Sequence, residues 1–148
     1  MPDPNAIEQV LAFDFGLKHI GVARGQSLTG SAAPVTTLQA KAGKVSWRLV
    51  EDLIQEEQPT VLLVGLPLNM DGSYGEITDP AKQFAQWLTL RSDLPVHMVD
   101  ERLTSVTANE RIFEKRPGRK AKSQSRGNHA IAACVIAESY FRDGPCDL

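Results

Sequence analysis

Several features are scarce or absent in this chain of 148 residues, and each absence excludes a class of protein. It has only two cysteines, Cys134 and Cys146, with no CxxC pair, so the sequence predicts reduced thiols rather than a disulfide framework or a zinc site. No apolar run approaches the roughly 18 residues that a membrane-spanning helix needs, so we expect no membrane partner. The first residues lack the basic start and apolar stretch of a secretory signal, which favours a cytoplasmic protein.

The composition that remains is that of an ordinary globular protein, with 42% apolar and 23% charged residues. No internal repeat or linker divides the chain, so we expect one domain over residues 1–148. The net charge of −2 hides an uneven distribution. Residues 115–126 contain no acid and carry six cations: Lys115, Arg116, Arg119, Lys120, Lys122 and Arg126.

This basic segment has no apolar periodicity, and glycine, proline and serine interrupt it, so we expect a solvated loop. A mobile cationic loop suits capture of a phosphate backbone. It contains no aromatic residue, so base stacking by this loop is not expected.

Hydrophobic periodicity predicts a mixed α/β fold. Short apolar runs predict strands at residues 10–15, 20–24, 30–38, 60–65 and 95–99. Helical spacing predicts helices before Pro59, from Asp79–Pro80 onward, and up to Phe113. Asn128 is the predicted cap of a closing helix that ends near Tyr140. The first three strands should form an antiparallel meander, and the later ones should add in parallel, giving a five-stranded sheet with helices on both faces.

Two apolar strands in this scheme end in acids. Asp14 lies inside the first strand, VLAFDF, where a buried carboxylate is costly unless it is paired or binds a cation. Asp100 and Glu101 follow the last strand, at the edge of the sheet where ligands bind in such folds. Carboxylates suit Mg²⁺, and metal pairs cleave phosphodiesters in many nucleases. Arg102 directly after them leaves a simple salt-bridge cluster as the alternative.

The segments FDFGLKHIGVA, VGLPLNMDG, VDERLTS and AIAACVIAESYF resemble the YqgF/RuvX family, from about Leu11 to Phe141. Proteins of that family are described as nucleases of the ribosomal RNA precursor and as Holliday-junction-resolvase-like. The resemblance implies an RNase H-like fold, two-metal phosphodiester cleavage, and action on the 5′ end of the 16S ribosomal RNA precursor, with the pre-ribosomal particle as a partner.

The resemblance also implies roles for individual residues. Asp14 matches the family's first acid and Glu101 its second, with Asp100 as a possible auxiliary ligand. Lys18 and Gly21 lie in the first matching segment, and Lys18 would hold substrate. Further residues in matching segments are candidates for phosphate contacts, although Thr104 or Ser105 could equally cap a helix: Asn69, Arg102, Thr104 and Ser105.

The chain departs from the family at one position. The family usually has a third acid at the start of its last helix, where this sequence has His129. Asp143 cannot replace it, because it lies roughly 20 Å further along a helix. His129 could ligate metal as a neutral imidazole and favour Mn²⁺ over Mg²⁺. Activity would then fall as the pH drops through the histidine range, near roughly 6.5. Alternatively the site works slowly with two acids, or it has lost catalysis.

Three other functions remain open from the sequence. A resolvase of branched DNA would need a dimer to place two cuts symmetrically, whereas a monomer or weak dimer suffices for structured RNA. A ribosome-maturation factor would bind RNA without cutting it. An actin-like ATPase subdomain is disfavoured, because one short domain leaves no second lobe to close over a nucleotide. His19 and His97 have no partner at metal-ligand spacing, so both are interpreted as structural.

Overall fold

The computed structural model describes residues 7–67, 69, 71–73, 75–100 and 121–145, and of residues 121–128 it describes the backbone alone. Its helices and strands follow one another in this order: β1 (Gln9–Asp14), β2 (His19–Gln26), β3 (Ser31–Gln39), α1 (Trp47–Glu57), β4 (Val61–Leu66), α2 (Thr78–Ser92), β5 (Val96–Asp100) and α4 (Ala121–Asp143). The predicted helix that ends near Phe113 lies outside the described residues.

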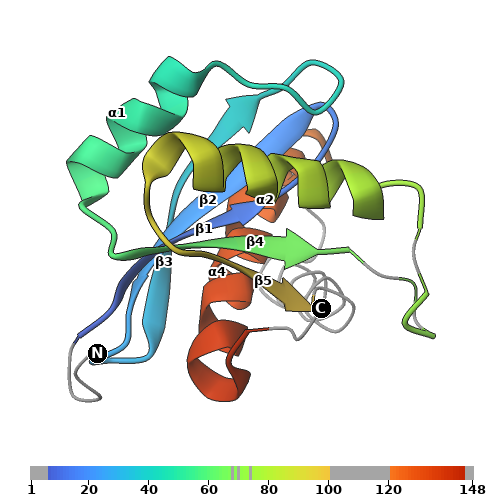
Figure 1. The fold of residues 1–148 in the computed structure, drawn as a ribbon. Coiled ribbons are helices and arrows are strands. Elements are labelled where there is room, and N and C mark those ends of the chain that lie inside the picture. Colours follow the sequence, from blue (N-terminus) through green and yellow to red (C-terminus); the bar gives the residue numbers. More distant parts are fainter. Residues whose placement is uncertain (1–6, 68, 70, 74, 101–120, 146–148) are drawn as a thin grey trace.

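The strands form one mixed sheet in the order β3-β2-β1-β4-β5 (Figure 1). β1, β2 and β3 pair in antiparallel fashion, as the short connections predicted. β4 pairs in parallel with β1, and β5 pairs in parallel with β4. The predicted fold class is therefore confirmed. Because β1, β4 and β5 run in the same direction, their carboxyl ends meet at one edge of the sheet.

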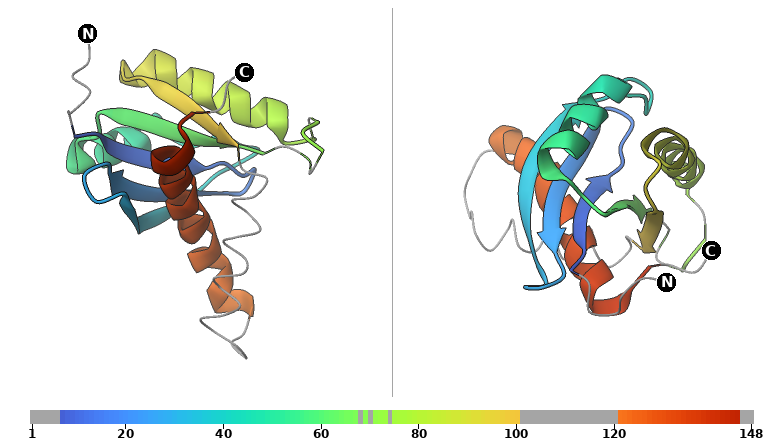
Figure 2. Two further views of the ribbon diagram at one scale, coloured as in Figure 1. Left: turned by 90° about the horizontal axis from the view of Figure 1, so that it is seen from below. Right: turned by 60° about the vertical axis from the view of Figure 1, so that its left-hand side comes forward.

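Helices cover both faces of this sheet, with α1 and α2 on one side and α4 on the other (Figures 1 and 2). Alternate side chains of each strand point to opposite faces. In β1, Leu11 and Phe13 join the core beneath α1 and α2, whereas Val10 and Ala12 pack against α4. All six residues of β4 are buried, as expected of a parallel strand that is covered on both faces.

The start of α4 corrects one prediction. The helix begins at Ala121, well before Asn128, so Asn128 does not cap it and residues 121–126 of the basic segment are not a loop. Lysine, glutamine and arginine are good helix formers, and the glycine at 127 costs only about 1 kcal/mol. Apolar periodicity is not needed there, because the first turns of α4 extend past the sheet (Figure 2).

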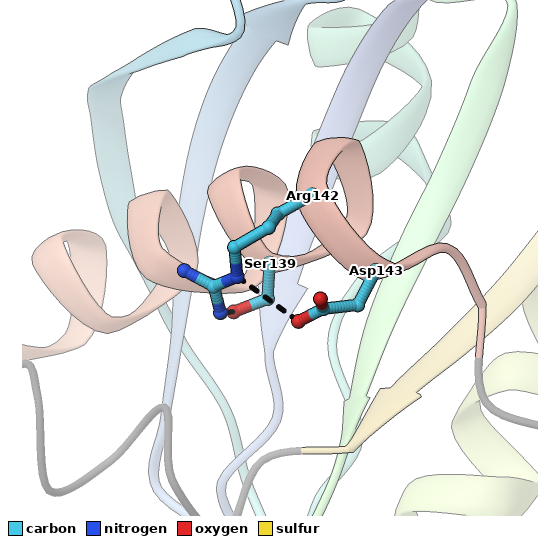
Figure 3. A network of polar contacts seen from close by, with 3 residues as sticks. All are labelled: Ser139, Arg142 and Asp143. Carbon is cyan, nitrogen blue, oxygen red and sulfur yellow. Dashed lines mark hydrogen bonds and ion pairs between the residues drawn. The ribbon is translucent and has the colours of Figure 1, made fainter.

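The last turn of α4 is held by polar contacts at the surface (Figure 3). The Nε atom of Arg142 donates to the carboxylate of Asp143 at 3.0 Å, and its guanidinium also donates to the hydroxyl of Ser139 at 3.4 Å. Asp143 thus lies at the far end of α4 from His129, as expected from their separation along the helix. Among the described residues, no helix combines the length and apolar character needed to span a membrane.

Candidate active site at the end of the central strand

The site begins with Asp14, the last residue of β1 and a half-buried one. Strand alternation places its side chain on the same face as Val10 and Ala12, beneath α4. Its direct partner in the β1–β2 ladder is Gly21. The carboxylate therefore lies at the carboxyl end of a central strand, where the sequence predicted a site.

Gly21 determines what lies beside that carboxylate. A Cβ atom at Gly21 would be 1.9 Å from the carbonyl oxygen of His129 and 2.8 Å from the amide nitrogen of Ala130. The absent side chain thus lets the backbone of α4 lie directly on β2 at His129. Because Gly21 is paired with Asp14, this contact also places His129 next to Asp14. A glycine inside a strand is a known signal of such close approach, and it could have been used at the sequence level.

The pKa of His129 reflects this surrounding. Burial lowers the pKa below the ordinary value of 6.5, the negative charge of Asp14 raises it, and the proximity of His19 lowers it again. The net direction is downward, so the imidazole is neutral at neutral pH. A neutral imidazole offers a nitrogen lone pair, which is the form that binds metal ions.

His19, at the start of β2, lies beside His129, a contact that the sequence interpretation of His19 as structural did not include. Its ring stacks on that of His129, with centroids 5.0 Å apart and planes inclined by 24°. Sequence spacing could not reveal this pairing, because the two histidines come from elements that meet only in the fold. His97 instead stacks on Tyr140, with ring centroids 6.0 Å apart, away from Asp14.

Two other predicted residues lie in loops at the same edge of the sheet. Lys18 is exposed in the turn between β1 and β2, and its carbonyl oxygen accepts a hydrogen bond from Ala40 at 2.8 Å. Asn69 lies in the β4–α2 connection, where its side-chain nitrogen donates to the Ser73 hydroxyl at 3.0 Å. In this structure Asn69 therefore holds its own loop together.

The second acidic position is only partly described. Asp100 ends β5 and alternates with Val99, which packs against α4. Alternation thus puts Asp100 on the face of Met98, away from Asp14. The remaining predicted residues lie outside the described residues, or belong to the start of α4, where only the backbone is described. The first group comprises Glu101, Arg102, Thr104, Ser105, Lys115, Arg116, Arg119 and Lys120, and the second Lys122 and Arg126.

The described donors match a divalent cation in kind, though not in number. Within the described ranges, no three histidine, cysteine or acidic side chains are grouped closely enough to hold a metal ion. Asp14 supplies carboxylate oxygens and His129 a neutral nitrogen, a mixed set suited to a cation of intermediate softness. Any third protein ligand would have to come from elsewhere, and Glu101 is the candidate that the sequence offers.

Two hollows of the described surface lie away from Asp14 and His129. One, of about 480 Å³, includes Arg24, which pairs with Glu57 at 3.4 Å. The other, of about 440 Å³, lies between Phe15 and Trp87, on the face of the sheet that α1 and α2 cover. Neither hollow is lined by Asp14 or His129.

Comparison with known proteins gives consistent results. Residues 8–143 match the model of the RuvX family, described as Holliday junction resolvase. A relative from Actinobacillus pleuropneumoniae, provisionally named a pre-16S rRNA nuclease, is 48% identical over 89% of this chain and 95% of its own. One from Shewanella denitrificans with the same name is 46% identical over 92% of this chain and 95% of its own.

Solved structures agree in fold. RuvC of Thermus thermophilus, determined with a Holliday junction substrate, superposes with a TM-score of 0.54 at 14% identity, covering 95% of this chain and 99% of that one. The fowlpox virus Holliday junction resolvase gives a TM-score of 0.55 at 11% identity, covering 90% of this chain and 97% of its own. At these identities the similarity establishes the fold.

Proposed function

Since the chain belongs to the RuvX family, we propose that it is a metal-dependent nuclease that processes the 5′ end of the 16S ribosomal RNA precursor. One observation carries the site assignment: Gly21 brings the backbone of His129 onto the strand position paired with Asp14. A carboxylate and a neutral imidazole are thereby held together at the carboxyl end of the central strand.

Asp14 and His129 would hold the divalent cation, Mg²⁺ or Mn²⁺, together with Glu101 from the second acidic position. Such a cation activates water and stabilises the leaving oxygen of a phosphodiester. Asp14 is fixed by the β1–β2 ladder and His129 by its backbone contact with Gly21, so both ligands sit on rigid elements rather than on loops. The imidazole nitrogen favours Mn²⁺ relative to an all-carboxylate site.

The lysine and arginine side chains of the protein would hold the substrate. Lys18 is exposed in the turn that follows Asp14 and can contact a phosphate beside the metal. The basic residues between positions 115 and 126 precede His129 along the chain. The last two, Lys122 and Arg126, lie in α4, as His129 does. They would bind the RNA backbone without reading its sequence, so affinity should fall steeply with salt.

The names of the relatives support ribosomal RNA as the substrate. The proposal includes maturation of a pre-ribosomal particle in the cytoplasm, by a monomer or weak dimer. A second candidate, cleavage of four-way DNA, is favoured by the description of the family model. It requires a dimer, because two symmetric cuts need two sites.

The test is cleavage of two substrates by the purified protein, a 16S precursor fragment and a four-way DNA junction, each with Mg²⁺ or Mn²⁺. Asp14→Asn tests the site, and Asp143→Asn is the matched control at the far end of α4. Cleavage of RNA that is lost in Asp14→Asn but kept in Asp143→Asn supports the proposal. Cleavage of the junction alone would favour the resolvase, and RNA binding with no cleavage would favour a maturation factor.

A further inference from the structure

The rings of His19 and His129 stack beside the candidate site, and the proposed reaction does not itself require His19. The ring centroids are 5.0 Å apart and the planes are inclined by 24°, so one face of each imidazole is covered by the other. Both residues are half-buried. Rotating the His129 side chain about its Cα–Cβ or Cβ–Cγ bond would break this overlap.

Close backbone packing fixes both members of the pair. His19 pairs with Gln39 in the β2–β3 ladder, and the turn before it is tight, because a Cβ at Gly16 would meet the His19 carbonyl oxygen at 2.4 Å. His129 is fixed from the other side, where its own carbonyl lies against Gly21. The two rings therefore meet between two rigid elements, β2 and α4.

The nearly parallel rings do not favour a shared metal ion. Two imidazoles that bind one cation direct their nitrogen lone pairs toward a common point, whereas stacked rings lie in separate planes. Accordingly, Asp14, His19 and His129 do not form a three-ligand cluster in the described structure. His19 is thus better suited to act through His129 than to bind metal itself.

We propose that His19 is a positioning residue, whose ring holds the imidazole of His129 in the orientation that binds the divalent cation. This inference rests on the proposed function, since it assigns His129 as a ligand. Interactions that orient a ligand commonly tune metal affinity. An aromatic contact contributes modestly, so loss of the stack should weaken Mn²⁺ binding roughly two- to tenfold.

The experiment uses Mn²⁺ as the probe and measures binding rather than cleavage. The chain has three histidines, so the imidazole signals in ¹H–¹⁵N NMR spectra are few and can be assigned with His129→Ala. Paramagnetic broadening by Mn²⁺ shows whether the ion binds beside the His19–His129 pair, and the signal of free Mn²⁺ in electron paramagnetic resonance gives the Kd. His19→Ala removes the ring, His19→Phe keeps a ring without nitrogen, and His97→Ala removes the other stacked histidine. Backbone amide spectra check that each variant is folded.

The inference predicts broadening of His129 in the wild type, a weaker Kd in His19→Ala, and near-wild-type Kd values in His19→Phe and His97→Ala. An unchanged Kd in folded His19→Ala overturns it while leaving the proposed function intact. Equal losses in His19→Ala and His19→Phe also overturn it, because they show that a nitrogen of His19, rather than the stacked ring, is needed. If Mn²⁺ fails to broaden His129 in the wild type, the ligand role in the proposed function fails first, and the positioning role fails with it.

Discussion

The carbonyl of His129 occupies the space in which a side chain at Gly21 would lie, with 1.9 Å between that oxygen and the Cβ that glycine lacks. Residues of β2 and α4 that are far apart in the sequence are therefore packed backbone against backbone. Gly21 is also the ladder partner of Asp14. One glycine thus controls both the packing of α4 and the geometry of the candidate site.

Gly21→Ala should lower both stability and metal binding. The added methyl group must displace α4, which should reduce the free energy of unfolding by about 2 to 3 kcal/mol. Urea denaturation measures this change. Gly30→Ala is the control: Gly30 has a φ of +65° and open space where a Cβ would lie, so only about 1 kcal/mol of backbone strain is expected. Equal losses of unfolding free energy in the two variants would show that α4 can move away from a methyl group at position 21 at little cost.

Asp14→Asn should act on His129 as well as on cleavage. The charge of Asp14 raises the pKa of His129, so the neutral amide should lower that pKa further. Loss of a metal ligand should reduce cleavage by at least about 100-fold. NMR titration of the His129 imidazole in metal-free protein measures the first effect. A His129 pKa that does not fall would mean that the two side chains are not electrostatically coupled.

His129→Asp should shift the metal preference of the enzyme. A carboxylate replaces the imidazole nitrogen, so the ratio of cleavage rates in Mg²⁺ and Mn²⁺ should move toward Mg²⁺ by about tenfold. In the metal-free protein the second carboxylate beside Asp14 should be repulsive, so stability should gain more from added metal than in the wild type. Thermal denaturation with and without metal tests this. An unchanged rate ratio would argue against ligation by His129.

Tyr140 should remain protonated in strongly alkaline solution. Its hydroxyl donates to the Glu8 carboxylate at 3.0 Å, and burial together with this bond raises the pKa of Tyr140 to about 12. A group that holds its proton more tightly when folded stabilises the fold below its ordinary pKa of 10. That contribution is lost as the pH rises from 10 toward 12.

Ultraviolet absorbance should therefore show one tyrosine that ionises later than a free phenol. Tyr140→Phe should cost about 1 kcal/mol at neutral pH and should reduce the loss of stability above pH 10. A stability profile with the same alkaline slope in both proteins would contradict the assignment.

Thr78→Val should loosen the connection between β4 and α2. The Thr78 side chain is fully buried, donates to the Pro67 carbonyl at 2.6 Å and accepts from the Gly75 amide at 2.8 Å. Valine has a similar shape but leaves both groups unpaired, which should cost about 1 to 3 kcal/mol. Thr89→Val, at an exposed position of the same helix, should change stability by less than about 0.5 kcal/mol. Hydrogen exchange at the Gly75 amide should be faster in Thr78→Val than in the wild type. Equal protection of this amide in the two proteins would contradict the prediction.

The sequence predicted those parts of the fold that depend on local patterning. The apolar runs of β1 and β4 and the helical spacing of α1 are set by burial on one or two faces, so periodicity finds them. The start of α4 does not depend on burial. Its first turns extend past the sheet, and there helix propensity decides the structure while Asn128 gives a misleading cap signal.

The position of Asp14 at the carboxyl end of β1 was predictable, because one strand carries the whole signal. His19 was missed because its partner, His129, arrives from another element, and linear spacing contains no information about ring stacking. The face of Asp100 follows from strand alternation only after the register of β5 is known. Glu101 remains a prediction, because it lies outside the described residues.

The placement of α4 has a consequence for the time at which the enzyme becomes active during its own synthesis. Asp14 is among the first residues to be made, whereas His129 lies in the last helix of the described chain, which packs on the sheet that the earlier segments form. Domains are synthesised from the N-terminus at about 5 to 20 residues per second, so the nascent chain would carry only part of the proposed site for several seconds. If His129 completes the site as proposed, a nuclease directed at ribosomal RNA would be inert while it is still attached to the ribosome that makes it.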